Sequence, residues 1–323
     1  MRPLLYALFC AAAALGQTSL PLQQVGVVPL AGVKGRIDHM SLDVKNRRLF
    51  ICALGNDTVE VVGLKTAKRI HSITGLSEPQ GVIYVARSNR LYVANGGDGT
   101  LRIFDGGSFK LLRTVAYGDD ADNVRFDLER KRVYVGYGDG ALGVIDLDGT
   151  KVANIRLDAH PESFQIENSG RRIFVNLPGS RKIVVIGQAK GLVEATWRTG
   201  GAFANFPMAL DEAEQRLFVV CRSPAEMIVF NTASGAIVAS LPAVGDSDDV
   251  FYDPVRKRIY ATGGAGAVWV YQERDSDHYQ AIGRIPTVEG ARTGFYSPEL
   301  DRLFVAVRQL GDRPAEIRIY EPR

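Results

Sequence analysis

One short motif recurs along nearly the whole chain: an arginine followed by an aliphatic, an aromatic and a second aliphatic residue. Its copies begin at Arg48, Arg90, Arg132, Arg172, Arg216, Arg258 and Arg302, so that successive copies are 40 to 44 residues apart. A nearly constant period in the forties is typical of an array in which each repeat is one supersecondary unit. Paired helices would place apolar residues three and four positions apart, a pattern that the copies lack. The period therefore predicts a β-propeller with seven blades.

Each repeat divides into four predicted strands, A to D, joined by turns rich in polar residues and glycine. In the first repeat these strands cover residues 40–43, 49–53, 58–62 and 69–73. The B strands are apolar without alternation, as expected of strands buried on both faces between neighbouring blades. An acidic residue precedes most of the motif arginines by a few positions, which predicts a repeated acid–arginine pair at the A–B corner.

The last repeat ends after its C strand, at Tyr320, and lacks a D strand. The segment Val25–Leu30 has the pattern of the missing strand, and we expect it to pair antiparallel with Ile317–Tyr320. Such pairing would remove the open edges of a linear array. The predicted fold class is all-β: a seven-bladed β-propeller of four-stranded antiparallel blades, with the last blade closed by the N-terminal strand. Residues 17–323 are predicted to form this single domain.

Residues 1–16 have the pattern of a secretory signal peptide, with basic Arg2, an apolar run over Leu4–Ala14 and small residues before Gln17. The run is shorter than the ~20 residues of a membrane-spanning helix. We therefore expect a periplasmic or secreted monomer without a membrane span. Beyond residue 16 the chain has two cysteines, Cys52 and Cys221, which lie in distant repeats and are expected to be free and buried.

The second repeat carries a family resemblance. Its Tyr92–Asn95 (YVAN) and Thr100–Asp105 (TLRIFD) segments follow a P-x-G-V entry at Pro79–Val82. With these motifs the chain resembles the YVTN-repeat (YncE-like) β-propellers, and the likeness extends in weaker form over residues 23–320. Other copies replace Asn95 by Ala53, Tyr137 and Gly263. The resemblance implies an exported seven-bladed ring. Roles within the family are mixed and include DNA binding, so it implies fold more than function.

The links between one repeat and the next are expected to surround one mouth of the central channel. Polar and acidic residues recur there, ten and nine positions before the motif arginines. The residues that we predict to bind a ligand are Asp38, His39, Gln80, Asp122, Asn123, Glu162, Asn205, Asp248, Asp249 and Arg292. Asn205 stands for the fifth repeat, which we interpret as carrying an insertion because Phe206 occupies its tenth position. These residues are flanked by Asp119, Asp120, His160 and Asp246.

Three interpretations of this ring stay open. Aspartate, asparagine and serine in tight links can cap the backbone locally without binding anything. The carboxylates of residues 119–123 and 246–249 also suit a hard cation, calcium or magnesium, as a cofactor. The third interpretation is a pocket for a small polar molecule or peptide, in which Arg292 and His39 are the only cations.

We predict an exported binding module whose acidic channel mouth holds a small polar ligand, a cation or a protein partner. The alternative is a metal-assisted hydrolase or lyase, similar to a lactonase, in which His39 or His160 assists. The sequence contains no G-x-S-x-G nucleophile elbow, and we prefer binding while leaving catalysis open. DNA binding is the third hypothesis, and a formal net charge of +3 disfavours nucleic acid as a partner.

Overall fold

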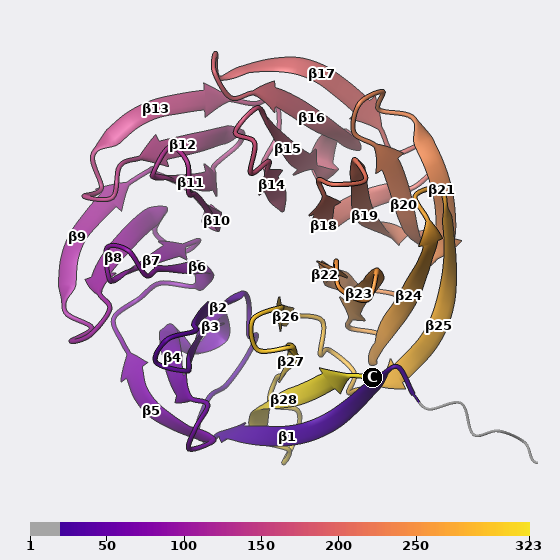
Figure 1. Ribbon diagram of the computed structural model, residues 1–323. Coiled ribbons are helices and arrows are strands. Elements are labelled where there is room, and N and C mark those ends of the chain that lie inside the picture. Colours follow the sequence, from indigo (N-terminus) through magenta and orange to yellow (C-terminus); the bar gives the residue numbers. More distant parts are fainter. Residues whose placement is uncertain (1–19) are drawn as a thin grey trace, which may run out of the picture.

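A computed structural model describes residues 20–323, and the predicted signal peptide of residues 1–16 lies outside these described residues. Within them the strands form seven four-stranded sheets arranged radially around a central channel (Figure 1). Every paired neighbour is antiparallel, as in the pairings that open and close the series. The predicted seven-bladed β-propeller is therefore confirmed. No helix among the described residues is long and apolar enough to cross a membrane.

Each blade runs from an inner strand beside the channel to an outer strand at the rim (Figure 1). The inner, A strands are β2 (Met40–Asp43), β6 (Pro79–Val85), β10 (Ala121–Asp127), β14 (Phe164–Ile166), β18 (Phe203–Asp211), β22 (Ser247–Asp253) and β26 (Gly294–Ser297). The B strands are β3 (Arg48–Ala53), β7 (Arg90–Asn95), β11 (Arg132–Tyr137), β15 (Arg172–Leu177), β19 (Arg216–Ser223), β23 (Arg258–Gly263) and β27 (Arg302–Val307). The C strands are β4 (Thr58–Gly63), β8 (Thr100–Asp105), β12 (Ala141–Ile145), β16 (Lys182–Gly187), β20 (Ala225–Asn231), β24 (Ala267–Asp275) and β28 (Ala315–Pro322). The outer, D strands are β5 (Lys68–Ile73), β9 (Leu111–Ala116), β13 (Lys151–Arg156), β17 (Leu192–Arg198), β21 (Ile237–Pro242), β25 (His278–Pro286) and β1 (Leu22–Leu30). Two short 3-10 turns, η1 (Leu54–Asn56) and η2 (Pro178–Ser180), lie in B–C connections.

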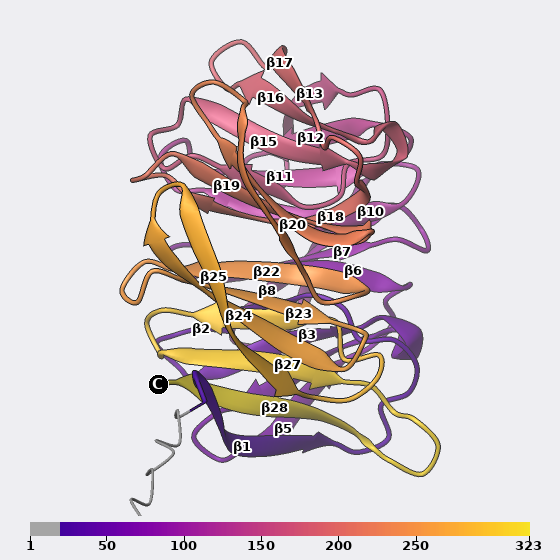
Figure 2. The same cartoon turned by 90° about the vertical axis from the view of Figure 1, so that its right-hand side faces the viewer.

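The seventh blade is assembled from segments at opposite ends of the described chain. β1 pairs antiparallel with β28, with Val28 opposite Ile317 and Leu30 opposite Ala315. Both views show the indigo β1 lying along the yellow β28 (Figures 1 and 2). The predicted closure is confirmed, and the closing strand begins earlier than expected, at Leu22. With blade 7 complete, blades 7 and 1 are in contact, and every blade has a neighbour on both of its faces.

The hydrophobic core is divided among the blade interfaces. Seven buried clusters occur among the described residues, and each draws its side chains from two adjacent blades. The cluster between blades 7 and 1 contains fully buried Val28, Leu49 and Ile317. Since a blade alone would leave both faces exposed, each blade depends on its two neighbours for burial. Cys52 and Cys221 are free and buried, as predicted.

The motif arginines only partly follow the predicted corner pairing. Arg48 pairs with Asp43 across the A–B corner at 2.6 Å, as expected. The expected pair of Arg216 with Asp211 is wrong, because Arg216 instead pairs with Asp277 in the next blade, at 2.7 Å. Asp211 Oδ1 accepts the backbone N–H groups of Ala213 and Glu214 in its own turn. Arg216 therefore links blade 5 to blade 6 through an ion pair.

The closing strand gives a direct test of the architecture. Val28 is fully buried against β28, whereas its neighbour Val27 is 40% exposed because successive strand residues face opposite sides. We expect Val28→Ala to lower the free energy of unfolding by about 2 kcal/mol, through lost burial and the cavity left behind. The matched change Val27→Ala should cost less than about 0.5 kcal/mol. Urea unfolding measures both values, and equal effects would contradict the observed register of β1.

Candidate functional site

The first residues of the inner strands are placed by irregularities in the sheets. The pairing of β6, β10, β18 and β22 with their B strands shifts register within their first residues. A bulge of this kind sets two residues opposite one and redirects their side chains. The residues ten positions before the motif arginines consequently line one cavity of about 150 Å³ at the channel mouth. They are Asp38, Gln80, Asp122, Glu162, Phe206, Asp248 and Arg292.

Eight of the ten predicted site residues line this mouth cavity: Asp38, His39, Gln80, Asp122, Asn123, Glu162, Asp248 and Arg292. Asp249 lies one level deeper, in a second cavity of about 330 Å³ that shares His39 and Ser163 with the first. The structure thus brings these side chains together, and their role in ligand binding stays a prediction.

The placement of Asn205 at the mouth is wrong. Asn205 is fully buried, and its amide donates hydrogen bonds to Asn176 Oδ1 at 3.0 Å and to the Lys182 carbonyl at 3.1 Å. β18 carries the same bulge as β6 and β10, with two residues opposite one, so the count of ten holds in the fifth blade and Phe206 occupies the ring position. Arg222 lies over the Phe206 ring, 3.8 Å from its centroid.

One side of the mouth consists of paired charges. Arg292 lies 3.2 Å from Asp248, Arg222 lies 2.5 Å from the same carboxylate, and Arg36 lies 2.8 Å from Asp38. The expectation that Arg292 and His39 are the only cations at the mouth is therefore wrong. Arg36 precedes the first A strand and Arg222 lies near the end of the B strand β19, two places that the count of ten before the motif arginine does not reach. These pairs neutralise much of the acidity that the sequence suggested.

The other side of the mouth has a cluster that no arginine or lysine among residues 20–323 pairs with. Asp122, His160 and Glu162 each offer one ligand atom, and these atoms lie within 4.8 Å of one another. Among residues 20–323 this is the single such group of histidine, cysteine and carboxylate side chains. His160 Nδ1 lies 2.7 Å from the Gly138 carbonyl, and its Nε2 faces Asp122 Oδ2 at 3.9 Å.

Burial and mutual repulsion shift the pKa values of this cluster. Burial raises the pKa of Glu162 to about 8, helped by the neighbouring Asp122 carboxylate. Burial would lower the pKa of His160, but the Asp122 carboxylate, the Gly138 carbonyl and the Glu162 carboxylate together outweigh burial and raise this pKa to about 9. Burial would likewise raise the pKa of Asp122, yet His160 and His39 hold it below its ordinary value. Positive charge is therefore favoured between these side chains.

His39 connects the two cavities. Its Nδ1 lies 3.5 Å from Asp249, and its Nε2 lies 3.4 Å from the Asn123 amide and 3.9 Å from Asp38. Burial would lower the pKa of His39, but the Asp249 carboxylate, followed by Asp38, raises it to about 10. Burial raises the pKa of Asp38 to about 7 against the opposing charges of His39 and Arg36.

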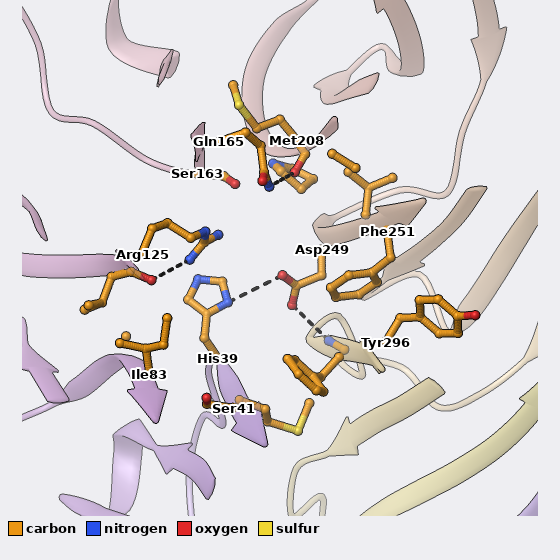
Figure 3. A pocket seen from close by; sticks show the side chains of 18 of the residues that line it. His39, Ser41, Ile83, Arg125, Ser163, Gln165, Met208, Asp249, Phe251 and Tyr296 are labelled. Atoms are coloured by element: carbon orange, nitrogen blue, oxygen red, sulfur yellow. Dashed lines mark hydrogen bonds and ion pairs between the residues drawn. The ribbon is translucent and has the colours of Figure 1, made fainter. Parts of the chain in front are cut away.

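The deeper cavity is lined by a second ring of inner-strand residues (Figure 3). They stand seven positions before the motif arginines: Ser41, Ile83, Arg125, Gln165, Ala209, Phe251 and Phe295. Arg125 is the single charged member of this ring. The sequence-based prediction covered only the mouth and did not include this level. Counting back seven residues from each motif arginine would have found it.

Comparison with known proteins places the chain by sequence and by fold. No protein-family model matches it. It is 24% identical to the uncharacterized protein YncE of Salmonella typhi over 274 residues, which are 82% of this chain and 65% of that relative. The uncharacterized protein YncE of Escherichia coli (strain K12) is 25% identical over 211 residues, 63% of this chain and 48% of the relative. The chain thus spans less than two thirds of the length of these relatives.

Solved structures share the fold at low sequence identity. A chain in the crystal structure of the mitotic checkpoint complex superimposes with a TM-score of 0.78 at 15% identity, covering 99% of this chain and 98% of that one. A chain of Kuenenia stuttgartiensis hydrazine synthase gives a TM-score of 0.72 at 18% identity, covering 89% of this chain and 100% of that one. These likenesses concern the fold alone. The chain is a closed seven-bladed β-propeller, and its sequence is similar to that of the YncE proteins.

Proposed function

We propose that this protein is an exported binding module that holds a divalent metal ion in the mouth of its central channel, beside a small polar ligand. The observation that carries the proposal is the convergence of Asp122, His160 and Glu162 at a place where no arginine or lysine pairs with them. Export is supported by the leader pattern of residues 1–16.

The protonation of His160 supports a cation at this place. A carbonyl oxygen only accepts hydrogen bonds, so Nδ1 must carry the proton that it shares with Gly138. In the neutral ring the lone pair of Nε2 then points toward Asp122, a contact between two acceptors. A proton or a metal ion between them removes that conflict. A histidine that ligates a metal commonly donates its other N–H to a backbone carbonyl, which orients the ring.

The donor set indicates which metal is favoured. Carboxylates alone led the sequence analysis to calcium or magnesium, which prefer oxygen ligands. The imidazole nitrogen of His160 changes this preference, because imidazole suits zinc and other transition metals. One nitrogen and two carboxylate oxygens also leave coordination positions for a ligand from solution. Zinc or manganese is therefore the ion that we propose.

The same geometry supports a second candidate, metal-assisted hydrolysis. The mouth cavity, which contains the cluster of Asp122, His160 and Glu162, shares two lining residues with the deeper cavity, namely His39 and Ser163. A substrate in the deeper cavity could therefore reach the mouth. A bound metal would supply Lewis-acid activation of a carbonyl or of water. Zinc-dependent hydrolysis of a simple lactone such as γ-butyrolactone, lost in His160→Asn, would establish this candidate over pure binding.

Metal binding can be tested by thermal unfolding. After EDTA treatment and dialysis, we expect zinc or manganese to raise the unfolding midpoint. At a free metal concentration 100 times Kd, the free energy of unfolding should increase by about 2.7 kcal/mol. His160→Asn and Glu162→Gln should each abolish the effect. His278→Asn is the matched control, because His278 lies 78% exposed on the outer strand β25 and should leave the effect intact. No response to zinc, manganese, calcium or magnesium would overturn the proposal.

A second prediction concerns pH. The folded pKa of His39 is about 10, above its ordinary value of 6.5, so its ion pair contributes fully below about pH 6.5 and is lost as the pH rises toward 10. In EDTA, we expect stability to fall between pH 7 and pH 10 by at least about 1 kcal/mol more in the wild type than in His39→Gln, since one pKa unit is about 1.4 kcal/mol. Groups such as Glu162 and His160 titrate in both proteins and cancel in the difference. Urea unfolding at several pH values measures it, with His278→Gln as control, and parallel curves would contradict the His39–Asp249 pair.

A further inference from the structure

The deeper cavity contains a guanidinium group that forms no ion pair with any carboxylate of residues 20–323. Arg125 extends from β10 into the cavity, as Figure 3 shows. A guanidinium has five N–H donors. Within the part of the chain that the structure describes, one acceptor is engaged, the Val124 carbonyl at 2.9 Å, and the group lies 5.5 Å from the centre of the Phe164 ring.

Two carboxylates are near enough to attract Arg125 without pairing with it. Asp249 and Asp122 raise the pKa of Arg125, but burial outweighs them and lowers it below its ordinary value. Asp249 is engaged elsewhere, since it pairs with His39 at 3.5 Å and accepts the Gly294 N–H at 2.9 Å. The charges of His39 and Asp249 compensate each other, so the positive charge of Arg125 stays unbalanced in the cavity.

Such a charge is costly without a counter-ion. Moving an ionised group out of water is unfavourable unless it is paired and hydrogen-bonded, and arginine does not escape the cost by deprotonation. A planar fork of free N–H donors matches a carboxylate, which can accept two of them in parallel. The cavity therefore has the chemistry of an anion site.

The walls restrict the kind of anion. Ile83, Phe251 and Phe295 contribute apolar surface around the cavity, whose volume of about 330 Å³ is at the lower end of the ~300–1,000 Å³ usual for small-molecule sites. Ser163 lines the same space, and the amide of Gln165 donates to the Met208 carbonyl at 2.9 Å (Figure 3). An inorganic anion would fill little of this volume and would leave the aromatic rings without contacts.

From this geometry we infer that the deeper cavity binds a small organic monocarboxylate, with its carboxylate on Arg125 and its apolar body against Phe251, Phe295 and Ile83. This site lies below the mouth cluster and does not depend on a metal. It adds a second ligand site, of opposite charge preference, to the proposed cation site at the mouth.

Benzoate is a suitable probe, because it combines a carboxylate with an apolar ring, and benzamide is its neutral counterpart. By isothermal titration calorimetry in EDTA, we expect benzoate to bind at least about ten-fold more tightly than benzamide. Arg125→Met should weaken benzoate binding about ten-fold or more, and Arg125→Lys should weaken it less. Arg87→Met, at an exposed A–B turn, is the matched control and should bind like the wild type.

Stability supplies a readout that does not depend on the choice of probe. Removal of an unpaired buried charge should raise the unfolding midpoint of the ligand-free protein in Arg125→Met, and Arg87→Met should leave it unchanged. A lower midpoint in Arg125→Met would show that the guanidinium is satisfied within the fold and would overturn the inference. Equal binding of benzoate and benzamide, or binding of phosphate without benzoate, would overturn the assignment to an organic carboxylate.

Discussion

The pairing of β1 with β28 is the contact on which the rest of the molecule depends. It joins segments almost 300 positions apart in sequence, such as Val28 and Ile317, in one sheet. Each core cluster is shared by two blades, so an open array would leave two blade faces without a partner. Arg258 strengthens the junction by donating to the Arg323 and Pro21 carbonyls. Since both cavities take side chains from blades all around the ring, closure also assembles the site.

A closed ring with a constant period places side chains by position in the repeat. Residues ten before each motif arginine lie at the mouth, and residues seven before lie one level deeper. Two successive inner-strand levels can therefore carry different chemistry without any change in the fold. A likeness in architecture, such as that to YncE, therefore does not fix the chemistry at positions such as Asp122 and Arg125.

The architecture was predictable because strand burial repeats at short range. The first blade was expected at residues 40–43, 49–53, 58–62 and 69–73, and each observed strand agrees within one residue at either end. The mouth ring was predictable because it lies at a fixed distance from the motif. Asn205 was misplaced because an insertion was assumed in the fifth repeat, whereas β18 has the same bulge as β6 and β10 and Phe206 holds the ring position.

The charges of the site were harder to predict, because pairing depends on contacts between distant segments. Arg36 and Arg222 reach the mouth from outside the inner strands, and they turn an apparently acidic ring into one with paired charges on one side. Arg216 likewise has an acid at the expected spacing, but it binds the next blade. Spacing along the chain indicates which groups could meet, whereas the competition between partners decides which of them do.

That competition also separates the two levels of the channel. Asp249 is the carboxylate that lies in the same cavity as Arg125, and the simplest outcome would be an ion pair between them. His39 and the Gly294 N–H hold Asp249 in place instead, and this leaves the guanidinium of Arg125 without a counter-ion. At the mouth, Arg36 pairs with Asp38 and Arg292 pairs with Asp248. Neither arginine pairs with the cluster that contains Asp122 and Glu162. The pairing of His39 with Asp249 is thus the contact that decides the charge of the deeper cavity, because it takes up the carboxylate that lies there with Arg125.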